Sequence, residues 1–221
     1  MFKNVIERLK LTPAYDIFRF FQQKNAYKEW EKNGKPSPPP PVVKQRIIKK
    51  YALTFSLDTL IETGTYLGET VLAVKDVFDT IFSIELDKTL AKRAQKKFSK
   101  YRHITIIEGD SGEIIQDILP KIKKPCLFWL DSHYSGGLTT KGAYDTPILQ
   151  ELSHIFNHQI KDHVVLIDDA RHFTGENDYP TLQELQDFAL KNRPGWSFSV
   201  RHDIIRFHKN ADLAVSDANK I

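Results

Sequence analysis

The sequence is poor in cysteine and methionine, with one of each in 221 residues, and it lacks a long apolar run. The single cysteine, Cys126, excludes an internal disulfide framework and a zinc site built from several cysteines. No apolar stretch reaches the roughly 18 to 20 residues that a membrane-spanning helix needs. The opening segment "MFKNVIERLKLTPAYD" also places charges where a signal peptide is continuously apolar. These absences predict a cytoplasmic protein with no transmembrane segment.

A strong charge of either sign is also missing. The formal net charge is +4 and the sequence pI is about 9.0. The basic residues fall in short clusters such as "KQRIIKK" and "KRAQKK", which are typical of solvated helix faces. No interleaving of aromatic and basic residues accompanies them, so we expect no nucleic-acid partner. An anionic small molecule fits the same charge balance.

Helical spacing of apolar residues and a proline run divide the chain into three predicted parts. Residues 1–35 form a helical extension, and residues 36–42 ("PSPPPPV") form a stiff polyproline-like linker. Residues 43–221 form the main domain. The extension has four interpretations: a cap on the main domain, the surface of a homodimer, reversible docking of its first helix on a membrane surface, or a lid over a substrate.

From residue 58 onward, strand patterns alternate with helix patterns. The strands read as continuous apolar runs, which indicates burial on both faces and hence a parallel sheet covered by helices. The sequence therefore predicts an α/β fold, doubly wound and Rossmann-like, with a mostly parallel seven-stranded sheet and an antiparallel C-terminal hairpin over 196–209. The five parallel strands are expected at 59–63, 80–86, 104–110, 126–131 and 164–169.

Acidic residues follow each of these five strands. Ligands of open parallel sheets bind beyond the carboxyl ends of the strands, so these side chains are expected to share one rim. Like charges brought together there repel one another, and hydrogen bonds or positive charge must compensate them. The acids are Glu62, Glu85, Asp110, Asp131, and Asp168 with Asp169.

A glycine turn follows the first strand, in the segment "ETGTYLG" from Glu62 to Gly68. Glu85 lies 21 residues after Gly64, the separation at which an acid meets ribose hydroxyls in dinucleotide folds. The turn lacks the third glycine of the G-x-G-x-x-G fingerprint, and Tyr66 stands where a glycine would admit a pyrophosphate. A ligand with a ribose but no phosphate, such as S-adenosylmethionine, fits this turn better than a dinucleotide.

With these motifs the sequence resembles the class I S-adenosylmethionine-dependent methyltransferases over about residues 55–209. The resemblance is carried by "ETGTYLG", "SIELD", "EGDS" and "FWLDSH", in that order, and by the closing hairpin. It implies that the glycine turn holds the methionine end, that the second strand's acid holds the ribose, and that the residues after the third strand hold the adenine edge. The implied cofactor-binding residues are Glu62, Gly64, Thr65, Tyr66, Gly68, Glu85, Asp110 and Ser111.

The acids after the fourth and fifth strands resemble the metal set of the metal-dependent O-methyltransferases. By that resemblance, Asp131, Asp168 and Asp169 would hold a divalent ion, and their hard oxygen ligands suit Mg²⁺. Such an ion lowers the pKa of a chelated hydroxyl group and prepares it for methyl transfer. The acceptor class implied is a small polar molecule, such as a sugar or another natural-product intermediate.

The general base of the reaction is less defined. Tyr134 stands where the catechol enzymes of this group have a lysine. We therefore expect the catalytic residues among His133, His172 and Asp131, which lie in or beside the loops after the fourth and fifth strands. Two other hypotheses remain open: an NAD(P)-type oxidoreductase on the same fold, and a binding or scaffold protein without turnover.

Overall fold

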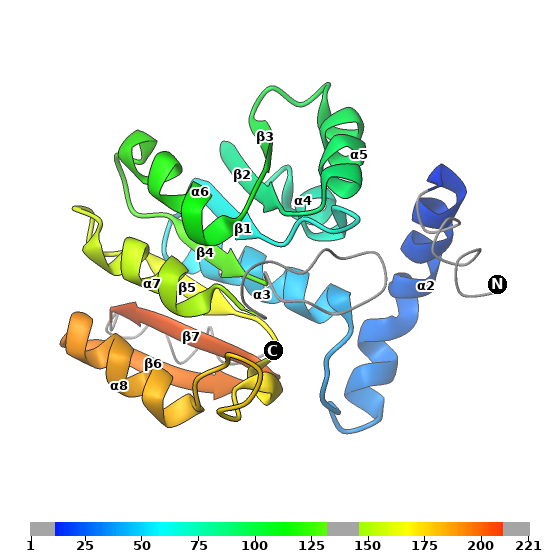
Figure 1. The fold of residues 1–221 in the computed structure, drawn as a ribbon. Helices are drawn as coiled ribbons and strands as arrows, with labels where there is room; N and C mark the ends of the chain where they lie inside the picture. The colour runs from blue at the N-terminus through cyan, green and yellow to red at the C-terminus, as the bar shows by residue number, and fades with distance from the viewer. Residues whose placement is uncertain (1–11, 132–145, 210–221) are drawn as a thin grey trace.

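The structure is a computed structural model that describes residues 12–131 and 146–209. Its centre is a seven-stranded sheet in the order β3-β2-β1-β4-β5-β7-β6 (Figure 1). The first five strands run parallel, and β7 pairs antiparallel with both β5 and β6. This is the predicted fold class, including the antiparallel hairpin at the end. The strands are β1 (Thr59–Thr63), β2 (Thr80–Glu85), β3 (Ile104–Glu108), β4 (Leu127–Leu130), β5 (Val164–Ile167), β6 (Trp196–Arg201) and β7 (Ile204–Lys209).

Helices cover both faces of this sheet. Successive residues of a strand point to opposite faces, so Leu60 belongs to one buried cluster and Ile61 to the other. The first cluster lies under α3 (Pro41–Thr54), α4 (Glu69–Val74) and α5 (Lys88–Phe98). The second lies under α6 (Ser111–Ile118), α7 (Ile148–Asn157) and α8 (Leu182–Asn192). The chain also forms two short 3-10 helices, η1 (Leu119–Lys121) and η2 (Ala170–His172).

Helix α2 (Pro13–Lys32) precedes these layers and stands to one side of the sheet in Figure 1. Its C-terminal end packs against the main domain: Trp30 is buried, and its indole nitrogen donates to the Pro36 carbonyl at 2.8 Å. The Trp30 ring also meets His202 in the β6–β7 turn at 4.9 Å between centroids. The predicted extension is therefore held to the main domain at this end.

Two aromatic side chains on α2, Phe18 and Phe21, are 59% and 64% exposed. A homodimer through the N-terminal helices stays a prediction, and these residues are where such a contact would form.

In the described part of the chain, none of the helices combines the length and the apolarity that a bilayer crossing requires.

The start of α8 follows a pattern that the sequence itself displays, Thr181 followed three residues later by Glu184. In the structure the Thr181 hydroxyl accepts from the Glu184 amide at 3.2 Å, and the Glu184 carboxylate accepts from the Thr181 amide at 2.8 Å. This capping box satisfies donors at the helix start that have no partner within the helix.

Replacing Thr181 with alanine is expected to lower the free energy of unfolding by about 1 kcal/mol, because the hydroxyl acceptor at the N-cap is lost. Thr181→Ser keeps that acceptor and serves as the matched control. Urea unfolding followed by circular dichroism measures both variants. Equal losses in the two would show that the cap contributes nothing.

Candidate functional site

The turn between β1 and α4 has the backbone shape that its glycines predict. Gly64 and Gly68 have φ angles of 85° and 69°, and Tyr66 between them has a φ of 47°. A non-glycine residue in this left-handed region is strained, so the turn must be held by its surroundings. The amides of Gly64 and Thr65 both donate to the Ile84 carbonyl, at 2.9 and 3.1 Å. A side chain at Gly68 would also collide with Phe98, because its Cβ atom would lie 2.7 Å from the phenyl ring.

Beneath the turn lies a chain of buried polar groups that begins at Glu62. The Ser83 hydroxyl donates to the Glu62 carboxylate, and the Ser83 and Thr65 hydroxyls lie 2.6 Å apart. Burial raises the pKa of Glu62 to about 8; the Ser83 hydrogen bond opposes this shift, and the charges of Asp131 and Glu85 add to it. Glu62 is only 1% exposed, and it supports the turn from below through Ser83 and Thr65. Its contact with the cofactor stays a prediction.

Glu85, at the end of β2, binds the backbone of the turn. Its carboxylate accepts from the Tyr66 amide at 2.7 Å and from the Asp87 amide at 2.9 Å. The first of these bonds stabilises the strained backbone at Tyr66. Burial raises the pKa of Glu85, while the backbone donors hold it down. An ionised carboxylate has about four acceptor positions, so one oxygen can also accept from a ribose hydroxyl.

Asp110 and Ser111 lie one strand further along the same rim, where β3 leads into α6. The Asp110 carboxylate caps α6 by accepting from the Gly112 amide at 2.9 Å, and Ser111 is buried. The parallel register that pairs Glu85 with Glu108 brings these residues beside the end of β2. The structure thus places the predicted cofactor residues at adjacent strand ends.

The three predicted metal ligands also come together. One carboxylate oxygen from each of Asp131, Asp168 and Asp169 lies within 4.8 Å of those of the others. The pairing of β4 with β5 causes this meeting, because Leu130 is level with Ile167 and the acids follow directly.

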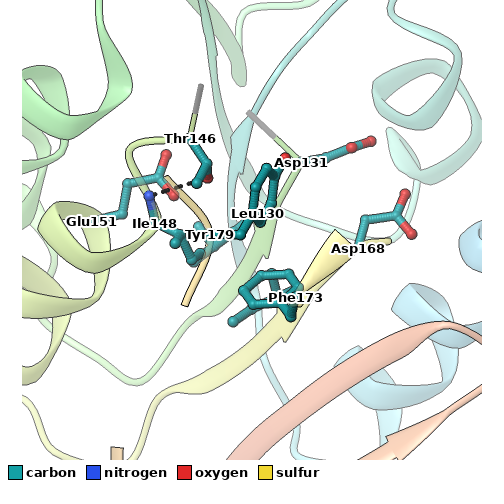
Figure 2. Close-up of a pocket in the computed structure, with 9 residues that line it drawn as sticks. Leu130, Asp131, Thr146, Ile148, Glu151, Asp168, Phe173 and Tyr179 are labelled. Atoms are coloured by element: carbon teal, nitrogen blue, oxygen red, sulfur yellow. Dashed lines mark hydrogen bonds between the residues drawn. The ribbon is translucent and has the colours of Figure 1, made fainter. Parts of the chain in front are cut away.

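The cluster borders a small hollow of about 10 Å³ (Figure 2). Asp131 and Asp168 lie on one side of this hollow, Glu151 lies on the opposite side, and Phe173 lies below. Thr146, Ile148 and Tyr179 are among the other lining residues.

Two basic side chains already contact these carboxylates. The Lys44 ammonium group donates to Asp168 and, at 3.1 Å, to Asp169. The Arg171 guanidinium group donates to Asp169 at 2.8 Å and also to Asp203. Burial and the charges of Asp131 and Asp169 raise the pKa of Asp168, and Lys44 opposes that shift.

The oxygen donors have the right chemistry for Mg²⁺, but the chain's own cations take up their oxygens. Both oxygens of Asp168 accept hydrogen bonds, one from Lys44 and the other from the Asp169 amide at 2.8 Å. A magnesium ion binds carboxylate oxygens at about 2.0 to 2.1 Å in near-octahedral geometry, which leaves no room for an ammonium group on the same atoms. With Lys44 in this position, the arrangement does not fit a divalent ion.

Of the two predicted catalytic histidines, the structure describes His172. His172 ends η2 with its Nε2 atom 4.0 Å from the Asp169 carboxylate, and its side chain is 46% exposed. It therefore stands beside the acid cluster with access to solvent. His133, Tyr134 and the rest of the loop 132–145 lie outside the described residues.

Three residues of the site were not identified from the sequence. Lys44 belongs to a basic helix that resembles an ordinary solvated face, Ser83 is one of many serines, and Asp203 lies in the hairpin turn. The two residues of this turn, His202 and Asp203, both have positive φ angles, a signal for a tight turn and not for a site. Lys44, Ser83 and Asp203 are recognised as site residues only by their contacts with the acids and with Arg171 in the structure.

One protein family matches part of this chain. Residues 40–114 match the ribosomal RNA adenine dimethylase family, a match that covers about a third of the chain. Curated proteins include no sequence match to the chain.

Solved structures resemble the whole described fold. A proposed caffeoyl-CoA O-methyltransferase from Staphylococcus aureus is 16% identical, with a TM-score of 0.56 over 89% of this chain and 98% of that one. An O-methyltransferase from Bacillus cereus in complex with SAH is 11% identical, with a TM-score of 0.57 over 84% and 90%. The SAH-bound methyltransferase PaMTH1 from Podospora anserina is 15% identical, with a TM-score of 0.54 over 90% and 95%. At these identities the likeness establishes the fold: it is that of the class I S-adenosylmethionine-dependent methyltransferases, and among them it resembles O-methyltransferases.

The buried Glu62 leads to a prediction for stability against pH. Its folded pKa of about 8 lies above the ordinary value of 4.5, so the unfolded chain releases this proton first. The free energy of unfolding should therefore fall as pH rises from about 4.5 to about 8, by up to about 1.4 kcal/mol per pH unit from this group. Glu62→Gln has no such proton, and its stability relative to wild type should increase across that window.

Urea unfolding of both proteins at intervals from about pH 5 to about pH 8.5, at constant ionic strength, measures this difference. A difference between variant and wild type that does not change with pH would mean that Glu62 is already ionised in the folded protein.

Proposed function

We propose that this protein is an S-adenosylmethionine-dependent methyltransferase that methylates a hydroxyl group of a small polar acceptor. The observation that carries the proposal is the glycine turn after β1, held by Glu85 from β2 and flanked by Asp110 at the end of β3. These residues form one continuous rim on adjacent parallel strands. The same rim continues to β4 and β5, where a second polar cluster lies.

The cofactor half of the rim fits S-adenosylmethionine, which supplies a methyl group on a positively charged sulfur. Glu85 would accept from the ribose hydroxyls, and Asp110 with Ser111 would border the adenine. The turn from Gly64 to Gly68 would hold the methionine end. A dinucleotide fits less well, because Tyr66 occupies the position of a phosphate-admitting glycine and because anionic groups of the rim would repel a pyrophosphate.

The acceptor half of the rim holds the groups that could position and deprotonate a hydroxyl group. His172 is the candidate general base, since it is partly exposed and lies beside Asp169. Asp131 follows β4, which pairs with β1 on the cofactor side and with β5 on the acceptor side. The participation of Mg²⁺, which the sequence resemblance implies, does not fit the contacts of Lys44 with Asp168 and Asp169 and enters no step here.

A methyltransferase acting on RNA is the second candidate, and the family match favours it. That match runs against the expectation of no nucleic-acid partner. It ends at residue 114, however, and so covers the cofactor half while stopping before β4 and the acid cluster. The shared part therefore supports the cofactor more than the acceptor, and sugars or other natural-product intermediates remain the acceptor class that we favour.

Isothermal titration is expected to show binding of S-adenosylhomocysteine and no binding of NAD. Glu85→Gln should weaken this binding by about tenfold or more, because a charged hydrogen-bond acceptor is worth about 1.5 to 3 kcal/mol. Glu29→Gln, an exposed position on α2 with the same change of charge, is the matched control. Binding of NAD in place of S-adenosylhomocysteine would overturn the proposal.

Transfer of a labelled methyl group from S-adenosylmethionine to a set of glycosides and catechols tests the acceptor. His172→Ala is expected to lower kcat by about 100-fold, the usual contribution of a general base, while binding of S-adenosylhomocysteine stays unchanged. Unmodified ribosomal RNA is assayed in parallel. Label that enters RNA and no small hydroxyl compound would establish the RNA candidate in place of the favoured one.

A further inference from the structure

Lys44 is a basic residue that extends from the helix layer into the candidate site. It lies on α3, a helix that covers the sheet and whose neighbouring side chains Val43, Ile47 and Ile48 are fully buried. The helix is thus fixed against the sheet, and the lysine leaves it at a defined place. Only 18% of its side chain is exposed, although a lysine is ordinarily among the most exposed residues.

The ammonium group of Lys44 ends among the three acids of the cluster. It contacts Asp168 and lies 3.1 Å from Asp169. Burial disfavours its charge, but the charges of Asp168, Asp131 and Asp169 outweigh burial and raise the pKa of Lys44. The ammonium group is therefore bound as a metal ion would be bound, through direct contact with oxygens of two carboxylates and through the charge of the third.

Arg171 contributes a second positive charge from the other side. It donates to Asp169 and to Asp203, so cations from both α3 and η2 compensate part of the negative charge of the cluster. A further cation of charge +2 placed on these oxygens would meet an ammonium and a guanidinium group at contact distance.

From this arrangement we propose that Lys44 supplies the resident cation of the acid cluster, in the position where metal-dependent O-methyltransferases would hold a divalent ion. The protein then binds no catalytic metal at Asp131, Asp168 and Asp169. An ammonium group has three donors, of which Asp168 and Asp169 receive two, and the third can be given to an oxygen of the acceptor. Lys44 would thereby orient the acceptor hydroxyl group and stabilise its developing negative charge. This last role rests on the proposed methyltransferase function, whereas the occupation of the cation position does not.

Electron paramagnetic resonance of free Mn²⁺ tests the occupation directly, with Mn²⁺ as the probe for a divalent site. Chelator-treated wild type at about pH 8 is expected to leave added Mn²⁺ free in solution. Lys44→Met removes the resident cation and should bind one Mn²⁺ at least about tenfold more tightly than wild type. Lys124→Met is the matched control: it makes the same charge change at an exposed ion pair with Asp58, before the start of β1, and should behave as wild type.

Stoichiometric binding of Mn²⁺ by the wild type, lost in Asp169→Asn, would overturn the proposal. Binding by neither the wild type nor a folded Lys44→Met would also overturn it, because the acids would then hold no cation position to fill. If circular dichroism shows that Lys44→Met does not fold, Lys44→Gln takes its place, and the wild-type titration still decides whether a divalent ion binds.

Turnover gives the second measurement. Methyl transfer by the wild type is expected to be unchanged by EDTA, and Lys44→Met should lose about 100-fold in kcat, as for other groups that stabilise developing charge. Inhibition by EDTA with recovery on added Mg²⁺ would contradict the proposal. Failure of the methyltransferase function itself would look different: no binding of S-adenosylhomocysteine and no transfer, with the Mn²⁺ results unaffected.

Discussion

The crowding of negative side chains at one edge of the sheet is the constraint on which the rest of the structure depends. Parallel strands bring their carboxyl ends together, so acids that are far apart in the sequence become neighbours and repel one another. The protein offsets this repulsion in several ways. Glu62 is buried with a pKa of about 8, Glu85 accepts from two backbone amides, and Asp110 caps a helix. Asp168 and Asp169 are instead paired with lysine and arginine side chains.

These means of compensation divide the rim into two halves. At β1, β2 and β3 the partners are hydroxyl groups and backbone amides, which leave a rim that remains acidic and suits a positively charged, ribose-containing methyl donor. At β4 and β5 the partners are cations, so part of the negative charge there is compensated and the rim can receive a polar acceptor. Asp131 lies at the boundary, because β4 pairs with both β1 and β5. The proposed reaction would take place across this boundary.

Much of the fold was predictable because it depends on local patterns. The strand predicted at 59–63 matches β1, since its continuous apolar run is visible in the sequence. The capping box of α8 was also visible, since its two residues are three positions apart. Helix α3 begins at Pro41 and so includes two residues of the predicted linker, because proline is favoured in the first turn of a helix. The contact of Trp30 with His202, which attaches α2 to the hairpin, was not predictable, since the two residues are far apart in the sequence.

The sequence by itself determined the class of fold, the position of the glycine turn and the acids that share one rim, because the succession of strands and helices along the chain and the ends of the strands follow from local patterns. Only the tertiary structure decided how those acids are compensated. Lys44 precedes Asp168 by 124 residues, and its helix resembles any solvated basic helix until it packs on the sheet. Whether a carboxylate cluster holds a metal ion or a lysine depends on which side chain fills the space between the oxygens, and long-range packing sets that choice.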